Sequence, residues 1–164
     1  MGKKSIREDK TIYQVYREEA ELTRAAASEA IQFMSDSRIE KIESEKTNPQ
    51  PDEILAMAKA YKRPELCNYF CSQVCPIGQE YVPEITEKSL SQITLEMVAT
   101  LNTLETKKNR LIEITVDGVI SKDEVSDFVE IRSQLERLSI ATDSLRLWLD
   151  KTIAAGDIGS EVLK

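Results

Sequence analysis

The chain of 164 residues contains no histidine, the side chain that most often serves as a general acid or base in enzymes. It also lacks a glycine-rich phosphate loop, a Ser-x-x-Lys string and a nucleophile elbow. Carboxylates are plentiful, but scattered carboxylates on helices are normally a solvated surface. The sequence therefore predicts a protein that is not an enzyme and needs no cofactor.

Glycine and proline are scarce, with five of each, and strand-like alternation of apolar and polar residues is nearly absent. A content of 41% hydrophobic and 31% charged residues favours one or two small helical domains over a β-rich fold. No run of about 18 apolar residues is present to span a membrane. The basic N-terminus is not followed by the apolar segment of a signal peptide, so we expect a cytoplasmic protein without a membrane partner.

The net charge of −7 is distributed unevenly along the chain. Residues 1–66 contain twelve Lys and Arg against thirteen Asp and Glu, whereas residues 67–164 contain ten against sixteen. The first part is therefore nearly neutral. Four basic residues near its start form either a DNA-binding arm or a solvated tail: Lys3, Lys4, Arg7 and Lys10. Four more surround the segment that follows: Arg24, Arg38, Lys41 and Lys46.

Residues 22–66 carry a series of helix starts and stops. Thr23 is suited to cap a helix rich in alanine, and Ser35 is suited to cap the next one, in which Ile39 and Ile42 are spaced to face a core. A break at Asn48 and Pro49 precedes a fourth helix. That helix has Pro51 at its start and apolar residues at helical spacing: Ile54, Leu55, Met57, Ala58 and Tyr61. Pro64 then opens a short fifth helix.

This pattern over residues 11–66 resembles the helix-turn-helix of lambda-repressor-like (XRE-type) DNA-binding proteins. The resemblance implies a five-helix domain whose third helix lies in the major groove of DNA. Two features depart from the family. The turn between the second and third helices, Gln32-Phe33-Met34, contains no glycine and is about one residue longer than usual. Arg24 stands where the family usually has glutamine, although arginine can also hold a phosphate or a base edge.

The resemblance also implies which side chains contact DNA. Three exposed positions of the third helix would face base edges: Asp36, Ser37 and Lys41. Three further residues are candidates for contacts to phosphates or nearby bases: Thr23, Arg24 and Arg38. Any of these six could instead be a solvated surface residue. The acidic Asp36 and Glu40 are unusual on such a face, although a carboxylate can accept from a cytosine amino group.

Beyond residue 66, Cys67, Cys71 and Cys75 recur every four residues, which would align three sulfur atoms along one face of a continuous helix. Thiolates favour soft metals and iron–sulfur centres. A closed structural zinc site needs four ligands, however, and the chain has no histidine to supply the fourth. We therefore expect small buried thiols in a reducing compartment, with no bound metal.

Residues 76–83 contain two prolines and a glycine, which predicts a linker between domains of residues 1–75 and 84–164. In the second domain, apolar residues recur at spacings of three, four or seven, which predicts two long amphipathic helices. The first stripe is Leu90, Ile93, Met97, Leu101, Leu104, Leu111 and Ile114. The second is Phe128, Ile131, Leu135, Leu138, Leu145 and Leu149, with Thr142 at one heptad position.

A hairpin of two helices buries little apolar surface by itself. The lambda-repressor-like family commonly reads two DNA half-sites as a dimer, so we expect the hairpin to form a homodimer as a four-helix bundle. The hairpin could instead pack on the N-terminal domain or hold another protein.

The connection between the two long helices resembles a calcium-binding EF-hand loop over the twelve residues that begin at Glu113. Gly118 and Glu124 match the sixth and twelfth positions, whereas Glu113 and Thr115 stand where the loop usually has aspartates. The same residues fit a simpler turn, in which Gly118 ends one helix and Ser121 and Glu124 form a capping box for the next. We expect the turn and no bound calcium.

Together these features predict an all-α protein, a five-helix lambda-repressor-like domain followed by a long antiparallel αα-hairpin. The most direct function is sequence-specific regulation of transcription by a dimer on a two-fold symmetric site in double-stranded DNA. The alternative is a protein-interaction adaptor that retains the helix-turn-helix scaffold without binding DNA. The near-neutral first part and the acidic residues of the third helix favour that alternative.

Overall fold

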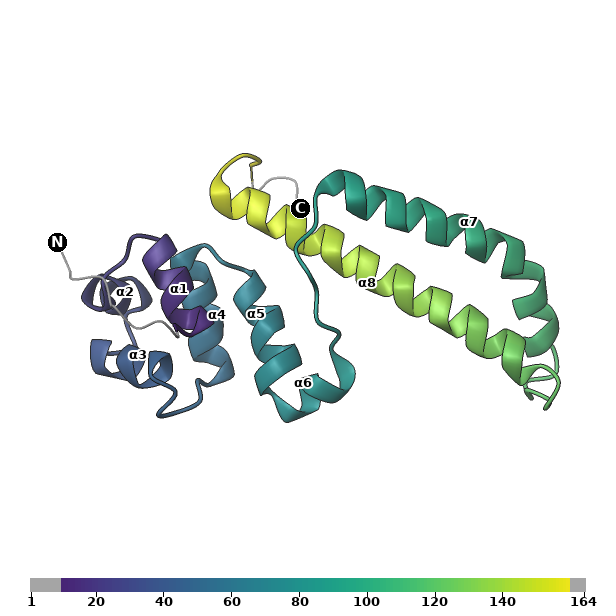
Figure 1. The fold of residues 1–164 in the computed structure, drawn as a ribbon, viewed down its shortest axis with the longest axis horizontal. Helices are drawn as coiled ribbons and strands as arrows, with labels where there is room; N and C mark the ends of the chain where they lie inside the picture. The colour runs from purple at the N-terminus through teal and green to yellow at the C-terminus, as the bar shows by residue number, and fades with distance from the viewer. Residues whose placement is uncertain (1–9, 160–164) are drawn as a thin grey trace. The chain divides into compact units, whose positions relative to one another are not determined.

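The computed structural model describes residues 10–159, and helices provide all of the regular structure in that range (Figure 1). In chain order they are α1 (Ile12–Glu19), α2 (Arg24–Ile31), α3 (Asp36–Glu43), α4 (Pro51–Tyr61), α5 (Glu65–Tyr69), the π-helix η1 (Phe70–Val74), α6 (Pro76–Tyr81), α7 (Leu90–Thr115) and α8 (Val125–Ala155). The predicted all-α fold is confirmed. Within the described residues, none of the helices is both long and apolar enough to cross a membrane.

The chain divides into two compact units. One contains the residues up to 84 together with those from 150 onward, and the other contains residues 85–149. Helices α1–α6 belong to the first unit, whereas α7 and most of α8 belong to the second.

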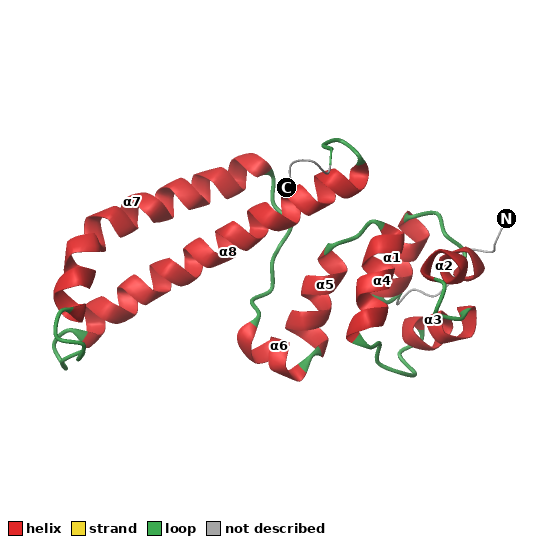
Figure 2. Ribbon diagram, turned by 180° about the vertical axis from the view of Figure 1, so that it is seen from behind, coloured by secondary structure: helices red, strands yellow, loops and turns green. Residues whose placement is uncertain are grey.

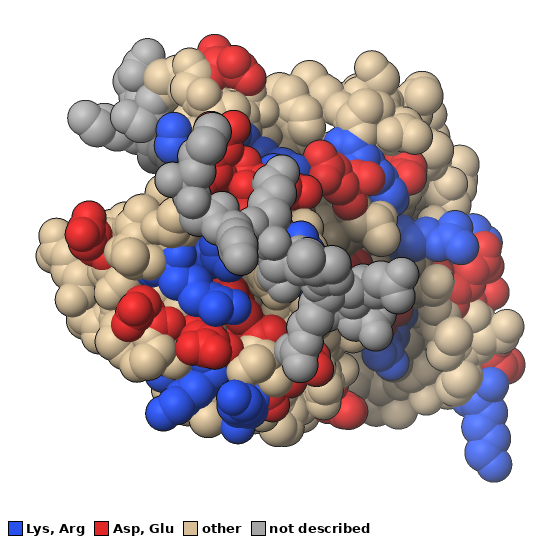
Figure 3. Space-filling view, turned by 60° about the vertical axis from the view of Figure 1, so that its left-hand side comes forward, with Lys and Arg blue, Asp and Glu red and all other residues tan. Residues whose placement is uncertain are grey.

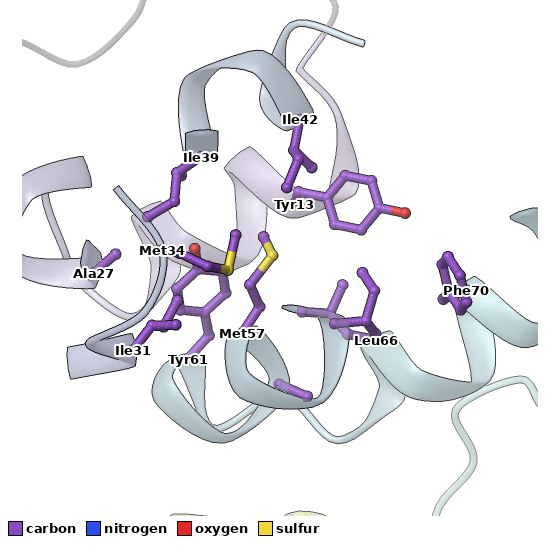
Figure 4. Close-up of a cluster of buried hydrophobic side chains, with 12 residues drawn as sticks. Tyr13, Ala27, Ile31, Met34, Ile39, Ile42, Met57, Tyr61, Leu66 and Phe70 are labelled. Carbon is purple, nitrogen blue, oxygen red and sulfur yellow. The ribbon is translucent and has the colours of Figure 1, made fainter. Parts of the chain in front are cut away.

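The first unit is built around a hydrophobic core to which each of α1–α5 contributes (Figure 4). The buried side chains are Tyr13, Ala27, Ile31, Met34, Ile39, Ile42, Ile54, Met57, Ala58, Tyr61, Leu66 and Phe70. Burying one large aliphatic side chain of this kind contributes about 1.5–3 kcal/mol. The predicted five-helix domain is confirmed, with one local exception. Leu55 is 50% exposed, because it lies on the outer face of α4.

The end of the first unit differs from the linker predicted at residues 76–83. Helix α6 occupies Pro76–Tyr81, and the segment without regular structure is residues 82–89. Pro76 and Gly78, two of the residues that predicted the linker, have local structural roles. Pro76 lies in the first turn of α6, where its missing N–H is no loss. Gly78 is buried against the main chain of Cys71, so closely that any Cβ would collide with the Cys71 carbonyl group.

In the second unit, α7 and α8 lie side by side as an antiparallel hairpin in both views (Figures 1 and 2). Two ion pairs connect them near the turn. Lys107 Nζ lies 2.9 Å from Glu130 Oε2, and Arg110 Nε lies 2.7 Å from Asp127 Oδ2. Exposed pairs of this kind add little stability, but they favour this alignment of the two helices over others.

The buried face of the hairpin differs in part from the predicted stripes. Leu101 is 48% exposed and Leu135 is 46% exposed, whereas Thr100, Ala141 and Ser144 are buried. Small residues let neighbouring helices approach closely, and a leucine cannot occupy the same space. Burial of the two hydroxyl groups is compensated, since each donates to a carbonyl four residues earlier in its own helix.

The connection between α7 and α8 has the predicted helix-ending form. Gly118 adopts a φ of 73°, a conformation that glycine enters without steric cost. Ser121 N and Oγ both donate to Glu124 Oε2, at 3.0 and 2.5 Å. Half of the predicted capping box is therefore present before α8: Glu124 accepts from Ser121 N, whereas the Ser121 hydroxyl donates to Glu124 instead of accepting from its N–H group.

The close approach at Gly78 gives a stability test. Replacing a glycine inside a helix with alanine usually stabilises a protein by about 0.5–1 kcal/mol. At Gly78 the added methyl group meets main chain that cannot rotate away. We expect Gly78→Ala to lower the free energy of unfolding by about 1–3 kcal/mol in urea titrations followed by circular dichroism.

The exposed Glu80 lies on the same helix and provides the control, since Glu80→Ala should change stability by no more than about 0.5 kcal/mol. An increase in stability for Gly78→Ala would contradict the packing described for α6.

Candidate nucleic-acid interface

Helices α2 and α3 each begin at a capped residue. Thr23 Oγ1 accepts a hydrogen bond from Ala26 N at 3.1 Å, and Ser35 Oγ accepts one from Arg38 N at 3.2 Å. Both caps predicted from the sequence are confirmed. They determine where α3 starts, and hence which of its residues lie in the first turn.

The turn between α2 and α3 accommodates its unusual sequence through a positive φ at a residue other than glycine. Gln32 has φ 70°, and Phe33 N donates to Ile31 O at 2.9 Å across it. Such a conformation costs a side chain about 1 kcal/mol or more. Met34 is buried and Ser28 Oγ donates to its carbonyl oxygen at 2.6 Å, whereas Phe33 is 61% exposed. The additional residue is therefore accommodated by turning Phe33 outward.

Helix α3 has two distinct faces. Ile39, Ile42 and Glu43 are buried against the rest of the unit. Four residues form the exposed face: Asp36, Ser37, Glu40 and Lys41. The first two interact locally, since Asp36 Oδ1 accepts from Ser37 N at 2.7 Å and Ser37 Oγ lies 3.0 Å from Ser35 Oγ. The structure thus brings Asp36, Ser37 and Lys41 together on one exposed surface.

Arg38 is engaged inside the unit, unlike its neighbours. Its Nε and Nη2 donate to the two carboxylate oxygens of Glu53, each at 2.7 Å, which is a bidentate pair. Nη1 donates to Thr47 Oγ1 at 2.7 Å, and Nη2 also reaches Asn48 O at 3.1 Å. Arg38 therefore connects α3 to the start of α4 and to the loop between them.

Arg24 lies at the start of α2, where its Nε donates to Glu43 Oε2 at 2.8 Å. Glu43 is fully buried and also accepts from Arg17, through Nε at 2.5 Å and Nη2 at 3.0 Å. Arg17 Nη1 in turn donates to Leu22 O at 2.7 Å, in the turn between α1 and α2. One carboxylate thus links α1, α2 and α3.

The protonation states of this group follow from its surroundings. Burial disfavours the charged form of Arg17, but the hydrogen bonds and the negative charge of Glu43 outweigh that effect and raise the pKa of the guanidinium. Arg17 is therefore held in its charged form beside Glu43.

Positive and negative side chains are interspersed on the face shown in Figure 3. Within the predicted basic arm, Lys10 is neutralised by Glu18, with Nζ 2.7 Å from Oε2. The other members of that arm, Lys3, Lys4 and Arg7, lie outside the described residues. The electrostatic attraction of the described part for a polyanion is accordingly modest.

The three cysteines are half-buried against the hydrophobic core rather than aligned on one continuous α-helix. Cys67 lies in α5, Cys71 in the π-helix η1 and Cys75 at the end of η1. Burial raises the pKa of the Cys67 thiol, which disfavours the thiolate form. Among residues 10–159, no cluster of Cys, Asp and Glu side chains has the arrangement of a metal site.

Sequence comparison identifies the N-terminal part of the chain. Residues 15–66 match the helix-turn-helix family model, so this part is a helix-turn-helix of the lambda-repressor-like (XRE) type. That family consists of DNA-binding regulatory domains and is not an enzyme family. Searches of curated proteins and of solved structures gave no match. The matched residues contain α2, the turn and α3.

The ion pair between Arg38 and Glu53 gives a stability test with a defined pH dependence. The hydrogen bonds from Arg38 lower the pKa of Glu53 below its ordinary value of 4.5, although burial opposes them. A carboxylate with a lowered folded pKa stabilises the fold above its unfolded pKa and loses that contribution as the pH falls through the folded pKa. Arg38→Ala should therefore lower the free energy of unfolding by about 1–3 kcal/mol at neutral pH.

The difference between the wild type and Arg38→Ala should shrink as the pH falls below about 4.5, as measured by urea unfolding at a series of pH values. A difference that stays constant down to about pH 3 would show that the ionised form of Glu53 does not contribute.

Proposed function

We propose that the protein is a sequence-specific transcriptional regulator that binds a two-fold symmetric DNA site as a homodimer, with α3 in the major groove. In this proposal the unit that contains α1–α6 binds DNA, residues 82–89 connect it to the hairpin, and the hairpin of α7 and α8 dimerises. One observation carries the proposal. Helix α3 is fixed through its buried face and its Ser35 cap, and it presents an exposed polar face of Asp36, Ser37, Glu40 and Lys41.

The residues of that face suit the edges of base pairs. A lysine can donate to the O6 and N7 atoms of guanine, a serine hydroxyl can donate or accept, and a carboxylate can accept from the amino group of cytosine. We assign these roles to Lys41, Ser37 and Asp36 respectively. The small side chains near the start of α3 allow its backbone to approach the floor of the groove.

Backbone contacts would come from the start of α2. Helix N-termini bind phosphates through their unpaired N–H groups and their positive dipole end. Thr23 and Arg24 lie at that end of α2, and the Arg24 side chain is 38% exposed. We assign Arg38 a different part from the one that the sequence predicts. With four hydrogen bonds inside the unit, it supports α3 rather than reaching for DNA.

The hairpin is the candidate for dimerisation. Leu95, Val98 and Leu101 are 70%, 49% and 48% exposed, and their spacing of three places them along one side of α7. Ile93, Thr100 and Ile114 are buried on another side of the same helix. Exposed apolar stripes on small domains are usually covered by a partner. A second copy fits because a two-fold symmetric pair of hairpins would place two helix-turn-helix units on one DNA duplex.

An adaptor that binds only protein is the second candidate. It is favoured by the acidic Asp36 and Glu40 on the exposed face of α3, which would lie close to DNA phosphates. The same experiments separate the two candidates, because an adaptor has no preference for any DNA sequence.

Two substitutions test the DNA-binding proposal, because each should weaken DNA binding in a different way. Lys41→Ala should weaken binding by about 1–3 kcal/mol and relax the preference for one base pair in each half-site. Arg24→Ala should weaken binding to all sequences alike and lower the dependence of log affinity on log salt by about one. The measurement is fluorescence anisotropy over a salt series, using duplexes enriched from a random pool by the wild type.

Lys59 provides the control, since it is an exposed lysine on α4, and Lys59→Ala should bind as the wild type does. If no sequence is enriched and neither substitution changes the residual binding, the adaptor replaces the DNA-binding proposal.

The dimer is tested by placing charges on the exposed stripe of α7. Leu95→Glu combined with Leu101→Glu should convert a dimer to a monomer in light scattering, because each glutamate would lose its hydration in the interface. Glu96→Lys changes the charge at an exposed position on another side of the same helix and should leave the dimer intact. A stripe variant that remains dimeric would place the interface elsewhere.

A further inference from the structure

We infer that Glu43 is a positioning residue for DNA binding, because it fixes the guanidinium of Arg24 in an orientation that leaves its two terminal nitrogens available to a phosphate. The inference rests on the DNA-binding function proposed above. It assigns a role to a buried carboxylate that cannot itself touch DNA.

The inference rests on which nitrogen atoms of the Arg24 guanidinium are hydrogen-bonded within the unit and which are not. Nε donates to Glu43 Oε2 at 2.8 Å. Among residues 10–159, neither Nη1 nor Nη2 of Arg24 has a hydrogen-bond partner, and 38% of the side chain is exposed. A guanidinium is planar, so holding Nε restricts the plane in which the other two nitrogens lie. Two adjacent N–H groups on one plane match the geometry of two phosphate oxygens.

Arg17 makes this arrangement possible. Glu43 has no exposed side-chain surface, whereas Arg17 is 7% exposed and donates one hydrogen bond to each carboxylate oxygen from inside the unit. The charge of Glu43 is thereby compensated without Arg24, and the charge of Arg24 remains available to DNA. Arg17 also holds Leu22 O, one residue before the cap of α2. The start of α2 and its arginine are therefore held by the same group.

Preorganisation explains how a nearly neutral domain could bind DNA. A long exposed arginine normally loses rotamer freedom when it grips a phosphate, which reduces the affinity that the contact provides. Arg24 has lost much of that freedom already, because Glu43 holds it in the free protein. A lysine at this position would keep the charge but could not donate to Glu43 and present two coplanar N–H groups at once.

The direction in which DNA affinity changes when the charge of Glu43 is removed separates a positioning role from simple electrostatic repulsion. Removing a negative charge close to DNA ordinarily strengthens binding, because less repulsion opposes the phosphates. If Glu43 positions Arg24, removing its charge should weaken binding instead. The exposed Glu40 on the same helix supplies the matched control for plain charge removal.

The experiment uses the full chain and the duplex that the wild type enriches from a random pool, with dissociation constants measured by anisotropy over a salt series. We expect Glu40→Gln to tighten binding by about two- to threefold and Glu43→Gln to weaken it by about five- to tenfold. Arg24→Lys should bind within about twofold of Arg24→Ala, whereas its salt slope should stay closer to that of the wild type because the charge is kept. Thermal unfolding of each variant shows whether it is folded at the temperature of the assay.

If the Glu43→Gln variant is folded and binds DNA more tightly than the wild type, as Glu40→Gln is expected to do, the inference is wrong. Where Glu43→Gln is unfolded, Arg24→Lys decides, because its side chain is partly exposed and the core keeps the pair of Arg17 and Glu43. Arg24→Lys with the affinity of the wild type would then overturn it. If the wild-type chain binds no duplex, both the DNA-binding function and the inference are wrong. If the wild type binds and the variants bind with the same affinity, only the inference is wrong.

Discussion

One buried carboxylate determines how the candidate DNA-binding surface is held. Glu43 accepts hydrogen bonds from Arg17 on α1 and from Arg24 on α2, while its own helix, α3, packs on the core through Ile39 and Ile42. Removing one partner of such a buried pair typically costs about 3–5 kcal/mol, because the other charge is left without compensation. The angle between α2 and α3 therefore depends on a polar contact as well as on apolar packing. That angle sets the distance between the residues proposed to contact the DNA backbone and those proposed to contact bases.

The fold was largely predictable because local signals and core packing agree. Caps at Thr23 and Ser35 and the apolar spacing of α3 and α4 all favour the helices that form. Prediction failed where one residue type serves two purposes. Proline and glycine mark a linker in most sequences, but here Gly78 allows α6 to approach η1 closely. The hydrophobic spacing likewise predicted that Leu101 is buried between α7 and α8. In the structure Leu101 is exposed and the smaller Thr100 is buried, because the helices pack closely there.

The candidate site was less predictable than the fold, because surface charges carry no information about their partners. Arg24 and Arg38 look alike in the sequence, yet Arg38 is bound by four internal hydrogen bonds and Arg24 by one. Arg17 and Glu43 were missed entirely. The signal for Glu43 was its spacing, since it lies four residues after Ile39 on the face that α3 buries. A charged residue at a core position requires a buried partner of opposite charge.

The central claim is that the exposed face of α3 lies against the bases of DNA, and photo-crosslinking tests it most directly. A photoreactive amino acid in place of Ser37 on α3, or in place of Lys59 on the exposed side of α4, would be irradiated in the presence of the preferred duplex. The account predicts crosslinks from position 37 to bases at one location in each half-site, and none from position 59. Equal crosslinking from both positions, or none from position 37 in a complex that forms normally, would contradict it.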